Sequence, residues 1–272
     1  LCFCIANLVS QTRTETDLLG DIKVPVDAYY GGQTARAIGN FQISGQYTNN
    51  YPDFMKAWGM IKLACARANT DVGEMTPAKL KMIEPACEEL IKGNYLDQFK
   101  VDLYQGGAGT STNMNANEVL ANIALEKAGY KKGEYDKISP NDDLNMAQST
   151  NDTYPTSLKL TMILQNGKVI NELKLLAKSF RTLGNTYLEI VKMGRTELQD
   201  AVPMTVGQEF HSYASMLEWN ISNIETANEA LKTLNMGGTA IGTGLNARKG
   251  YDIAVIKHLN KITGITFVNA DD

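Results

Sequence analysis

The chain lacks the features that mark several large classes of protein. No apolar run approaches the roughly 18 residues of a membrane span. No basic cluster is present and the net charge is −4, which argues against a binder of nucleic acid or of membrane surfaces. Internal repeats and low-complexity segments are also absent. With 43% hydrophobic and 21% charged residues, the 272 residues are expected to form one or two globular domains rather than a disordered chain.

Cysteine and histidine are scarce, with four and two residues. Cys65 and Cys87 lie on apolar helical stripes and are expected to be buried thiols, as in a protein of the reducing cytoplasm. Cys2 and Cys4 form a single Cys-x-Cys with no second ligand pair at a suitable spacing, so no metal site is predicted. The two histidines lie within helical patterns and are expected to be packed or solvated: His211 and His258.

Residues 1–11 form an extension of unclear status. Leu1 to Val9 is apolar but lacks the basic region and small-residue cleavage site of a signal peptide. We interpret it as translated upstream sequence, with a degenerate targeting segment as the alternative. At the other end the chain stops at Asp272 without a helix cap or a polar tail.

Helical periodicity dominates the rest of the chain and predicts a mainly α fold. Six helices are expected, beginning near these residues: Phe54, Leu80, Asn115, Pro155, Thr205 and Ile253. Thr12 to Pro25 is expected to form short strands or extended chain. Pro85 lies inside the second stripe and predicts a kink or a restart there, whereas Pro155 suits the first turn of its helix. The long apolar faces of the later helices predict an oligomer.

Two helix starts carry the pattern of a capping box, in which a polar side chain and a Glu or Gln three residues later bond each other's backbone N–H groups. Asn115 with Glu118 is one such pair, and Thr205 with Gln208 is the other.

Three short segments are rich in hydroxyl and amide side chains and stand before predicted helices: Gly106–Asn115, Gln148–Asp152 and Gly194–Asp200. Together they supply many hydrogen-bond donors and almost no fixed positive charge. Such a site suits a small carboxylate that gains negative charge during a reaction. Simpler interpretations are a flexible loop for the first segment, a helix cap at Asp152 or Thr153 for the second, and a surface loop for the third.

The glycine-rich runs do not indicate a nucleotide site. Gly106 to Gly109 is not followed by Gly-Lys-Ser/Thr, and no strand–turn–helix unit surrounds it. The second run, Gly237 to Gly244, also lacks a lysine and is expected to form a turn. A phosphate or nucleotide binder is therefore disfavoured.

Several longer motifs resemble the aspartase/fumarase superfamily, and the resemblance runs from about Thr12 to Asp272. The matching runs are Asp17–Gly20, Asp27–Gly31, Gln105–Val119, Gln148–Pro155, Lys192–Phe210 and Gly238–Asn246. The residues Gly106–Thr110 match the sequence of the ammonia-lyase branch and not that of the fumarase branch. The resemblance implies an aspartase/fumarase-like fold, with an N-terminal helical lyase domain at 12–145 and a central long-helix bundle at 146–272 that is incomplete at its C-terminus.

The resemblance implies a reversible elimination that converts L-aspartate to fumarate and ammonia through an enediolate. Hydroxyls, amides and helix-end N–H groups would stabilise the second negative charge on the carboxylate. By the family's pattern, the β-carboxylate would be held by four residues: Thr110, Ser149, Thr150 and Thr196. Asn151, with help from Thr110, would lie near the ammonium. No organic cofactor is implied; some relatives are activated by a divalent metal, but no ligand cluster is visible here.

Two positions depart from the fumarase pattern. Fumarases carry His where this chain has Glu197, and His where it has Ser139 before Pro-Asn-Asp. A carboxylate at residue 197 would repel a dicarboxylate and attract an ammonium, so we hypothesise that Glu197 favours an amine leaving group.

A third departure is an absence. The family's proton-abstracting serine lies on a Gly-Ser-Ser loop, and the sequence contains no such run. The loop is expected beyond Asp272, so these 272 residues alone are predicted to be inactive. The resemblance implies a cytoplasmic homotetramer whose active sites are each built from three subunits. The alternatives are a class II fumarate hydratase, or a non-catalytic helical scaffold without the loop.

Overall fold

The computed structural model describes residues 11–271. The predicted extension at 1–11, including Cys2 and Cys4, lies outside these residues apart from Gln11. Contacts divide the chain into two compact units. The first contains the residues up to Thr161 and those from Thr233 onward, and the second is Met162–Lys232. The expected division into 12–145 and 146–272 stays a prediction.

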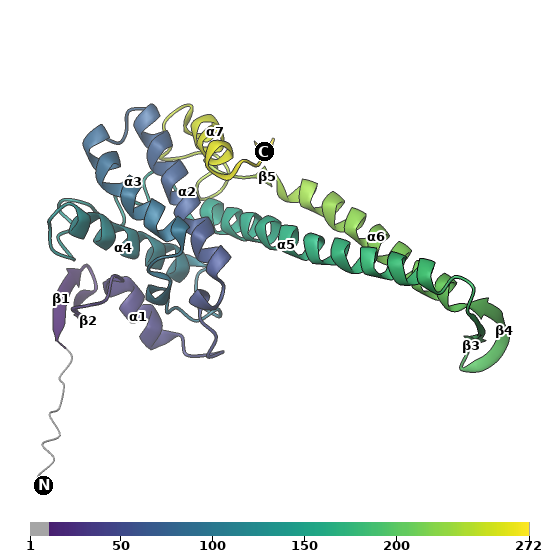
Figure 1. Ribbon diagram of the computed structural model, residues 1–272. Coiled ribbons are helices and arrows are strands. Elements are labelled where there is room, and N and C mark those ends of the chain that lie inside the picture. The colour runs from purple at the N-terminus through teal and green to yellow at the C-terminus, as the bar shows by residue number, and fades with distance from the viewer. Residues whose placement is uncertain (1–10, 272) are drawn as a thin grey trace, which may run out of the picture. The chain divides into compact units, whose positions relative to one another are not determined.

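The predicted mainly α fold is confirmed (Figure 1). The α-helices are α1 (Gly32–Asn40), α2 (Pro52–Asp71), α3 (Pro77–Lys92), α4 (Thr110–Lys127), α5 (Thr150–Thr186), α6 (Val206–Leu231) and α7 (Tyr251–Thr263). Short 3₁₀ helices are η1 (Thr48–Asn50) and η2 (Leu96–Gln98). Three two-stranded sheets pair β1 (Thr12–Asp17) with β2 (Gly20–Pro25), β3 (Val191–Thr196) with β4 (Gln199–Thr205), and β5 (Thr233–Leu234) with β6 (Val268–Asn269). The last pair is parallel and the others antiparallel.

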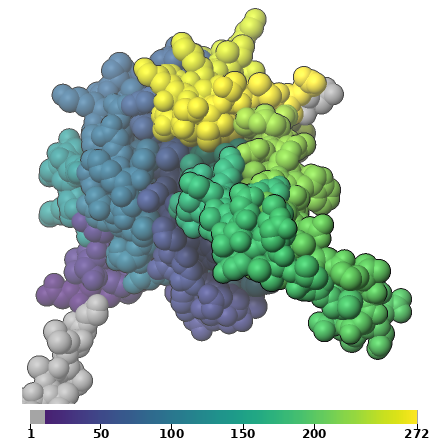
Figure 2. All heavy atoms as spheres, turned by 45° about the vertical axis from the view of Figure 1, so that its right-hand side comes forward, coloured from purple at the N-terminus to yellow at the C-terminus, as the bar shows by residue number. Residues whose placement is uncertain are grey.

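Helix α2 is the centre of the first unit. Pro52 opens it at a position where the missing N–H is harmless, and its stripe of large apolar residues is almost completely buried. It packs most extensively against α3 and α7, and α3 also packs against α4. Figures 1 and 2 show the yellow residues of α7 lying over the blue residues of this region. The predicted burial of Cys65 and Cys87 in this core is confirmed.

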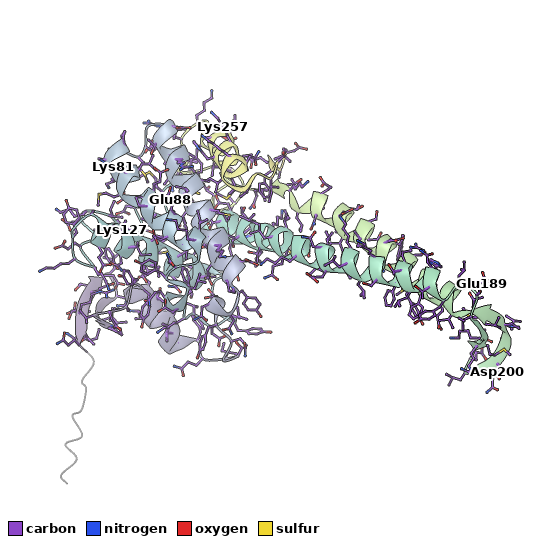
Figure 3. The ribbon with its side chains drawn as sticks, in the orientation of Figure 1. Lys81, Glu88, Lys127, Glu189, Asp200 and Lys257 are labelled. Carbon is purple, nitrogen blue, oxygen red and sulfur yellow. The ribbon has the colours of Figure 1, made fainter. Side chains whose placement is uncertain are left out.

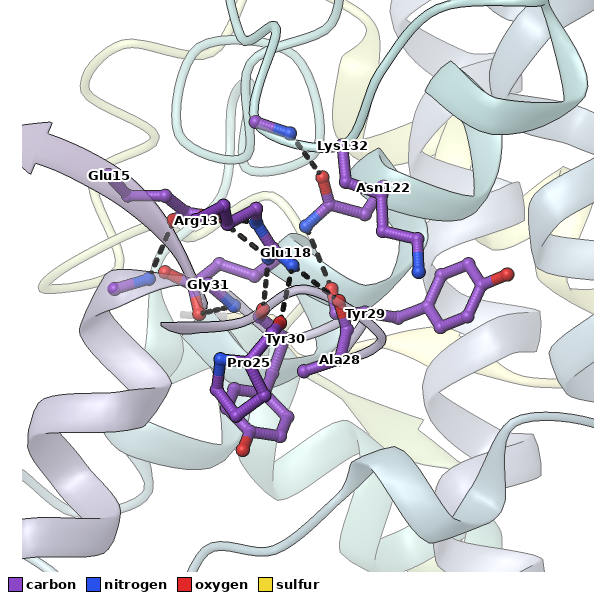
Figure 4. A network of polar contacts seen from close by, with 12 residues as sticks. Arg13, Glu15, Pro25, Ala28, Tyr29, Tyr30, Gly31, Glu118, Asn122 and Lys132 are labelled. Carbon is purple, nitrogen blue, oxygen red and sulfur yellow. Dashed lines mark hydrogen bonds and ion pairs between the residues drawn. The ribbon is translucent and has the colours of Figure 1, made fainter. Parts of the chain in front are cut away.

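A buried polar network fixes the start of α1 (Figure 4). The side chain of Glu118 on α4 is 3% exposed and accepts the backbone N–H groups of Gly31, Gln33 and Thr34 at 2.8, 2.9 and 3.0 Å. These are N–H groups that a helix leaves unsatisfied at its N-terminus, and a carboxylate there also suits the helix dipole. Glu118 therefore caps α1, and the capping box predicted for it with Asn115 is wrong.

Helix α4 begins at Thr110, five residues before the predicted start. The side chain of Gln105 accepts the N–H of Thr112 at 2.7 Å, so a residue outside the helix supplies the cap. Asn115 is fully buried inside α4 and donates to the carbonyl of Gln98 at 3.2 Å. The predicted cap position failed because Asn115 is used for a contact between elements.

The prediction for Pro155 also needs correction. Helix α5 begins at Thr150, so Pro155 lies inside it, and the carbonyl of Asn151 loses its helical donor. The side-chain amide of Asn235 donates to that carbonyl at 2.9 Å and replaces the lost bond. Helix α3 runs through Pro85 without a restart, because buried residues on both sides hold it in the core, including Ile83 and Cys87. The kink expected at Pro85 stays a prediction.

The second unit is an antiparallel helix pair closed by a hairpin. The part of α5 from Met162 onward lies beside α6. The two helices are joined by an ion pair between Arg181 and Glu218 at 2.6 Å and by the stacked rings of Phe180 and Phe210. The predicted capping box of Thr205 with Gln208 is confirmed at the start of α6. Large apolar side chains of this unit are exposed, such as Trp219 at 67%. The sequence did not predict the β3–β4 hairpin, which follows Glu189 and includes Asp200 (Figure 3).

No helix within residues 11–271 is both long enough and apolar enough to span a membrane.

Candidate active site

The first polar segment forms a tight turn that leads into α4. Gly107, Ala108 and Gly109 all have positive φ, at 70°, 47° and 97°. Glycine adopts this left-handed conformation freely, whereas a residue with a Cβ does so at a cost of about 1–2 kcal/mol. Thr110 follows as the first residue of α4, and its hydroxyl donates to the carbonyl of Gly107 at 2.5 Å. Its side chain is exposed at the mouth of the turn.

The ring of Tyr154 on α5 packs against this turn. A Cβ at Gly109 would lie 2.2 Å from Cδ2 of the Tyr154 ring, far inside van der Waals contact. Only glycine allows so close an approach. The first segment is therefore docked on the helix that carries the second segment.

The second polar segment caps α5. Ser149 Oγ accepts the N–H of Asn151 at 3.2 Å, and the carboxylate of Asp152 accepts the N–H of Ser149 at 3.0 Å. Asp152 is fully buried and also accepts the N–H of Thr239 at 3.1 Å. Burial raises the pKa of Asp152 to about 6, against the N–H donors that favour its charged form. Ser149 is therefore the residue that caps α5, and Asp152, which was expected to cap the helix, lies inside its first turn and binds the N–H of Ser149 in return.

Thr150 is the first residue of α5, and its hydroxyl oxygen accepts from the side-chain amide of Asn113 on α4 at 3.1 Å. Thr150 and Asn151 line a cavity of about 810 Å³ together with three residues of the glycine-rich turn: Gly106, Ala108 and Gly109. The structure thus brings the first two polar segments to one place, at the N-termini of two helices. Helix N-termini attract anions through their free N–H groups and dipole.

Asn151 also fixes the second glycine-rich run. Its side-chain amide donates to the carbonyl of Ala240 at 2.7 Å, beside the contact of Thr239 with Asp152. Gly237 and Gly242 have positive φ, at 86° and 95°, as a turn requires. The expected turn is confirmed, and the contacts show that it supports the start of α5.

Thr196 and Glu197 belong to the second unit. They lie where β3 turns into β4, with Thr196 paired to Gln199 across a two-residue loop of Glu197 and Leu198. Both loop residues have positive φ, 51° and 64°, which tight hairpins require and which usually selects Asn or Gly. Both side chains are exposed, so the expected surface loop is confirmed as a hairpin turn.

One residue of the first unit was not predicted to belong near the site. Lys62 on α2 is 1% exposed, and its ammonium donates to Asn113 and to Gln148, each at 2.8 Å. The signal was present in the sequence, because Lys62 stands four residues after Trp58 and three before Cys65, on the apolar stripe itself. A lysine at such a position is buried only with partners.

Among residues 11–271, no three His, Cys, Asp or Glu side chains gather in a way that could hold a metal ion. The histidines have protein partners, as expected for packed side chains. His258 contacts Asp71 at 2.8 Å, and His211 lies 3.3 Å from a guanidinium nitrogen of Arg181.

Comparison with known proteins identifies relatives along most of the chain. A family model described as Lyase matches residues 20–272. An aspartate ammonia-lyase from Pseudomonas aeruginosa is 50% identical over 257 residues, covering 94% of this chain and 54% of the relative. A crystal structure of a fumarate lyase:delta crystallin from Brucella melitensis superposes with a TM-score of 0.94 at 44% identity, covering 96% of this chain and 57% of that one. A class II fumarase from Schistosoma mansoni gives 0.90 at 33% identity, covering 96% and 58%.

These matches confirm the predicted aspartase/fumarase-like family and fold. The chain spans about half the length of the curated relatives it matches.

Proposed function

The chain belongs to the lyase family, and we propose that the complete protein eliminates ammonia reversibly from L-aspartate to give fumarate. Similarity to aspartate ammonia-lyases along nearly the whole chain carries the choice of reaction. The geometry supports the choice of site, because Thr150 and Asn151 at the start of α5 line a cavity together with the glycine-rich turn. The complete protein is proposed to act in the cytoplasm, on a small-molecule substrate and without an organic cofactor.

In this proposal the substrate's β-carboxylate lies at the N-terminus of α5. Ser149 and Thr150 would bind it through their hydroxyl groups, with N–H groups of the helix start behind them. Thr110 would join them once its hydroxyl turns from the carbonyl of Gly107 toward the substrate. As a base removes the proton from the adjacent carbon, the carboxylate becomes an enediolate with a second negative charge. Donors already aimed at that oxygen stabilise the intermediate more than the substrate, which is the condition for a faster reaction.

Asn151 is proposed to lie near the ammonium. Its amide nitrogen is engaged with Ala240, which leaves its side-chain oxygen as the group suited to accept from an ammonium. Thr196 and Glu197 would join the site from another copy of the chain, since the resemblance implies a homotetramer with shared sites. The base is proposed to be the serine of a Gly-Ser-Ser loop, a run that these 272 residues do not contain.

The test is to express the complete coding sequence and to follow fumarate absorbance with L-aspartate or L-malate as the substrate. Fumarate from aspartate supports the proposal. Turnover of malate alone would assign the protein to the fumarate hydratases, the activity that the structural similarity to a class II fumarase favours. No turnover of either substrate by a folded complete protein would favour the non-catalytic scaffold.

Glu197 is tested in the same assay. Glu197→Gln removes a negative charge from the exposed hairpin turn, and we expect kcat/KM for aspartate to fall by about tenfold, the effect of one charge pair near a protein surface. Glu189→Gln is the matched control, because Glu189 is also an exposed carboxylate of the second unit. Unchanged aspartate turnover in Glu197→Gln would remove the proposed role.

A further inference from the structure

A buried positive charge lies directly behind the start of α5. The ammonium of Lys62 is surrounded by neutral acceptors: Asn113 Oδ1 at 2.8 Å, Gln148 Oε1 at 2.8 Å and Asn145 Oδ1 at 3.5 Å. It also lies 5.5 Å from the ring centroid of Trp58. Within residues 11–271 no ion pair joins Lys62 to a carboxylate. A buried charge is normally paired, so one without a contacting counter-ion calls for a functional explanation.

One acceptor of Lys62 connects it by hydrogen bonds to the candidate site. Asn113 accepts from Lys62 through its oxygen and donates through its nitrogen to the hydroxyl oxygen of Thr150 at 3.1 Å. Because the oxygen of Thr150 accepts this bond, its own O–H is left to donate elsewhere. A chain of hydrogen bonds that begins at a cation polarises each later donor, which strengthens the bond that Thr150 can offer to an anion.

The second acceptor supports the neighbouring residue. Gln148 takes the other strong bond from Lys62, and its side-chain nitrogen donates to the carbonyls of Leu144 and Met146 at 3.0 and 3.1 Å. Gln148 immediately precedes Ser149, so Lys62 fixes the backbone on which Ser149 stands. One ammonium therefore orders both hydroxyl residues at the start of α5.

We propose that Lys62 is a positioning residue that orients Thr150 and Ser149, and that the bound carboxylate supplies a counter-charge in addition to the Asp152 carboxylate, which does not contact Lys62. The inference rests on the proposed function for the identity of the anion, a dicarboxylate or its amino derivative. It explains how a site with almost no fixed positive charge in its three polar segments stabilises an enediolate. Lys62 does not touch the substrate in this arrangement and acts through Asn113 and Gln148.

The titratable groups around Lys62 do not change charge in the pH range where Lys62 does, so a change in binding with pH in that range reports the charge of Lys62. Desolvation lowers the pKa of Lys62 to about 8, against the attraction of the Asp152 carboxylate. Asp152 faces it from α5 with a pKa raised to about 6, so it is ionised well before Lys62 loses its proton. Burial raises the pKa of Cys65 on α2 to about 12 and also raises that of Cys87 on α3, so both thiols stay neutral across the window of Lys62.

The experiment measures turnover and succinate affinity in the complete protein. Succinate is a dicarboxylate that does not react and whose carboxylates stay ionised at alkaline pH. Lys62→Gln keeps a hydrogen-bond donor without the charge, and Lys62→Met removes both. Lys56→Met is the matched control on the same helix, since Lys56 is more exposed and outside this network. Folding of each variant is checked by circular dichroism and thermal melting.

In the wild type we expect succinate affinity to fall as the pH rises through about 8, because Lys62 is charged below that value and neutral above it. In both Lys62 variants we expect affinity to be about 10- to 100-fold weaker and this pH limb to be absent, with kcat/KM reduced at least as much. The Lys56 control should keep the wild-type affinity and profile. A merely structural role for Lys62 would alter the melting temperature without removing the pH limb.

The outcomes separate this inference from the proposed function. If the wild type converts malate but not aspartate, the ammonia-lyase proposal fails, and the Lys62 variants are still tested with malate and succinate. Folded Lys62 variants with wild-type affinity and pH profile would overturn the inference, whatever the reaction is. If neither variant folds, the wild-type profile decides, since an affinity that stays level through about pH 8 overturns it.

Discussion

Replacing Glu118 with alanine should release the start of α1. The carboxylate is the acceptor for three backbone N–H groups, those of Gly31, Gln33 and Thr34, at 2.8 to 3.0 Å. Each bond to a buried charged acceptor contributes about 1.5–3 kcal/mol net, so three contribute roughly 4.5–9 kcal/mol. Water that enters the space left by the side chain would recover part of this. We take about 3 kcal/mol as the loss in local stability.

Amide hydrogen exchange is the assay, because it reports local opening of α1 within the complete protein. Each 1.4 kcal/mol is about tenfold in an equilibrium constant, so exchange in peptides that cover 29–40 should be about 100-fold faster in Glu118→Ala. Glu118→Gln should fall between, since its amide offers only one oxygen to the three donors. Glu88→Ala is the control, because Glu88 is exposed on α3 (Figure 3). Wild-type protection in Glu118→Ala would refute the reasoning.

Two further predictions concern the start of α5. Gly109→Ala should lower both thermal stability and kcat/KM for aspartate, because its Cβ would meet the Tyr154 ring at 2.2 Å. Gly129→Ala, at a similar φ of 86° with nothing within 4 Å, is the control that carries only the backbone cost of about 1 kcal/mol; equal losses in the two variants would contradict the clash. Asp152 has a folded pKa of about 6, above an unfolded value near 3.9, so the folded state holds its proton more tightly. Its contribution to stability should therefore rise by up to about 3 kcal/mol as the pH falls through 6 toward 4, and a melting series at several pH values should show a smaller rise in Asp152→Asn.

The parts of the fold that depend on local signals were predictable. The apolar stripe from Phe54 gave α2, and the pattern of Thr205 with Gln208 gave the start of α6, because both depend on residues within one helix. The start of α4 was not predictable in this way. Its cap comes from Gln105, and its glycine turn is shaped by the ring of Tyr154 from a later helix. Caps supplied across elements leave no local pattern.

The candidate site shows the same division. Local sequence around Ser149 and Asp152 fitted a helix cap, and the structure confirms the cap, so spacing alone did not distinguish binding from capping. The resemblance to a lyase family selected Thr150 as a binding residue. Only the packing of α2 against α4 showed that a cation stands behind it, because Lys62 is far from that segment in the sequence.

Pro155 has a consequence for the order in which the chain folds during synthesis. It interrupts the hydrogen-bonded ladder of α5 after the first turn, and that turn is completed by residues made 84 to 89 positions later, Asn235, Thr239 and Ala240. A nascent chain can therefore form the part of α5 that follows Pro155 while the first turn of the helix, which begins at Thr150, still lacks its hydrogen-bond partners. The candidate site is assembled only after the ribosome has passed the second glycine-rich run, so a pause or truncation before it would leave a helical but incomplete unit.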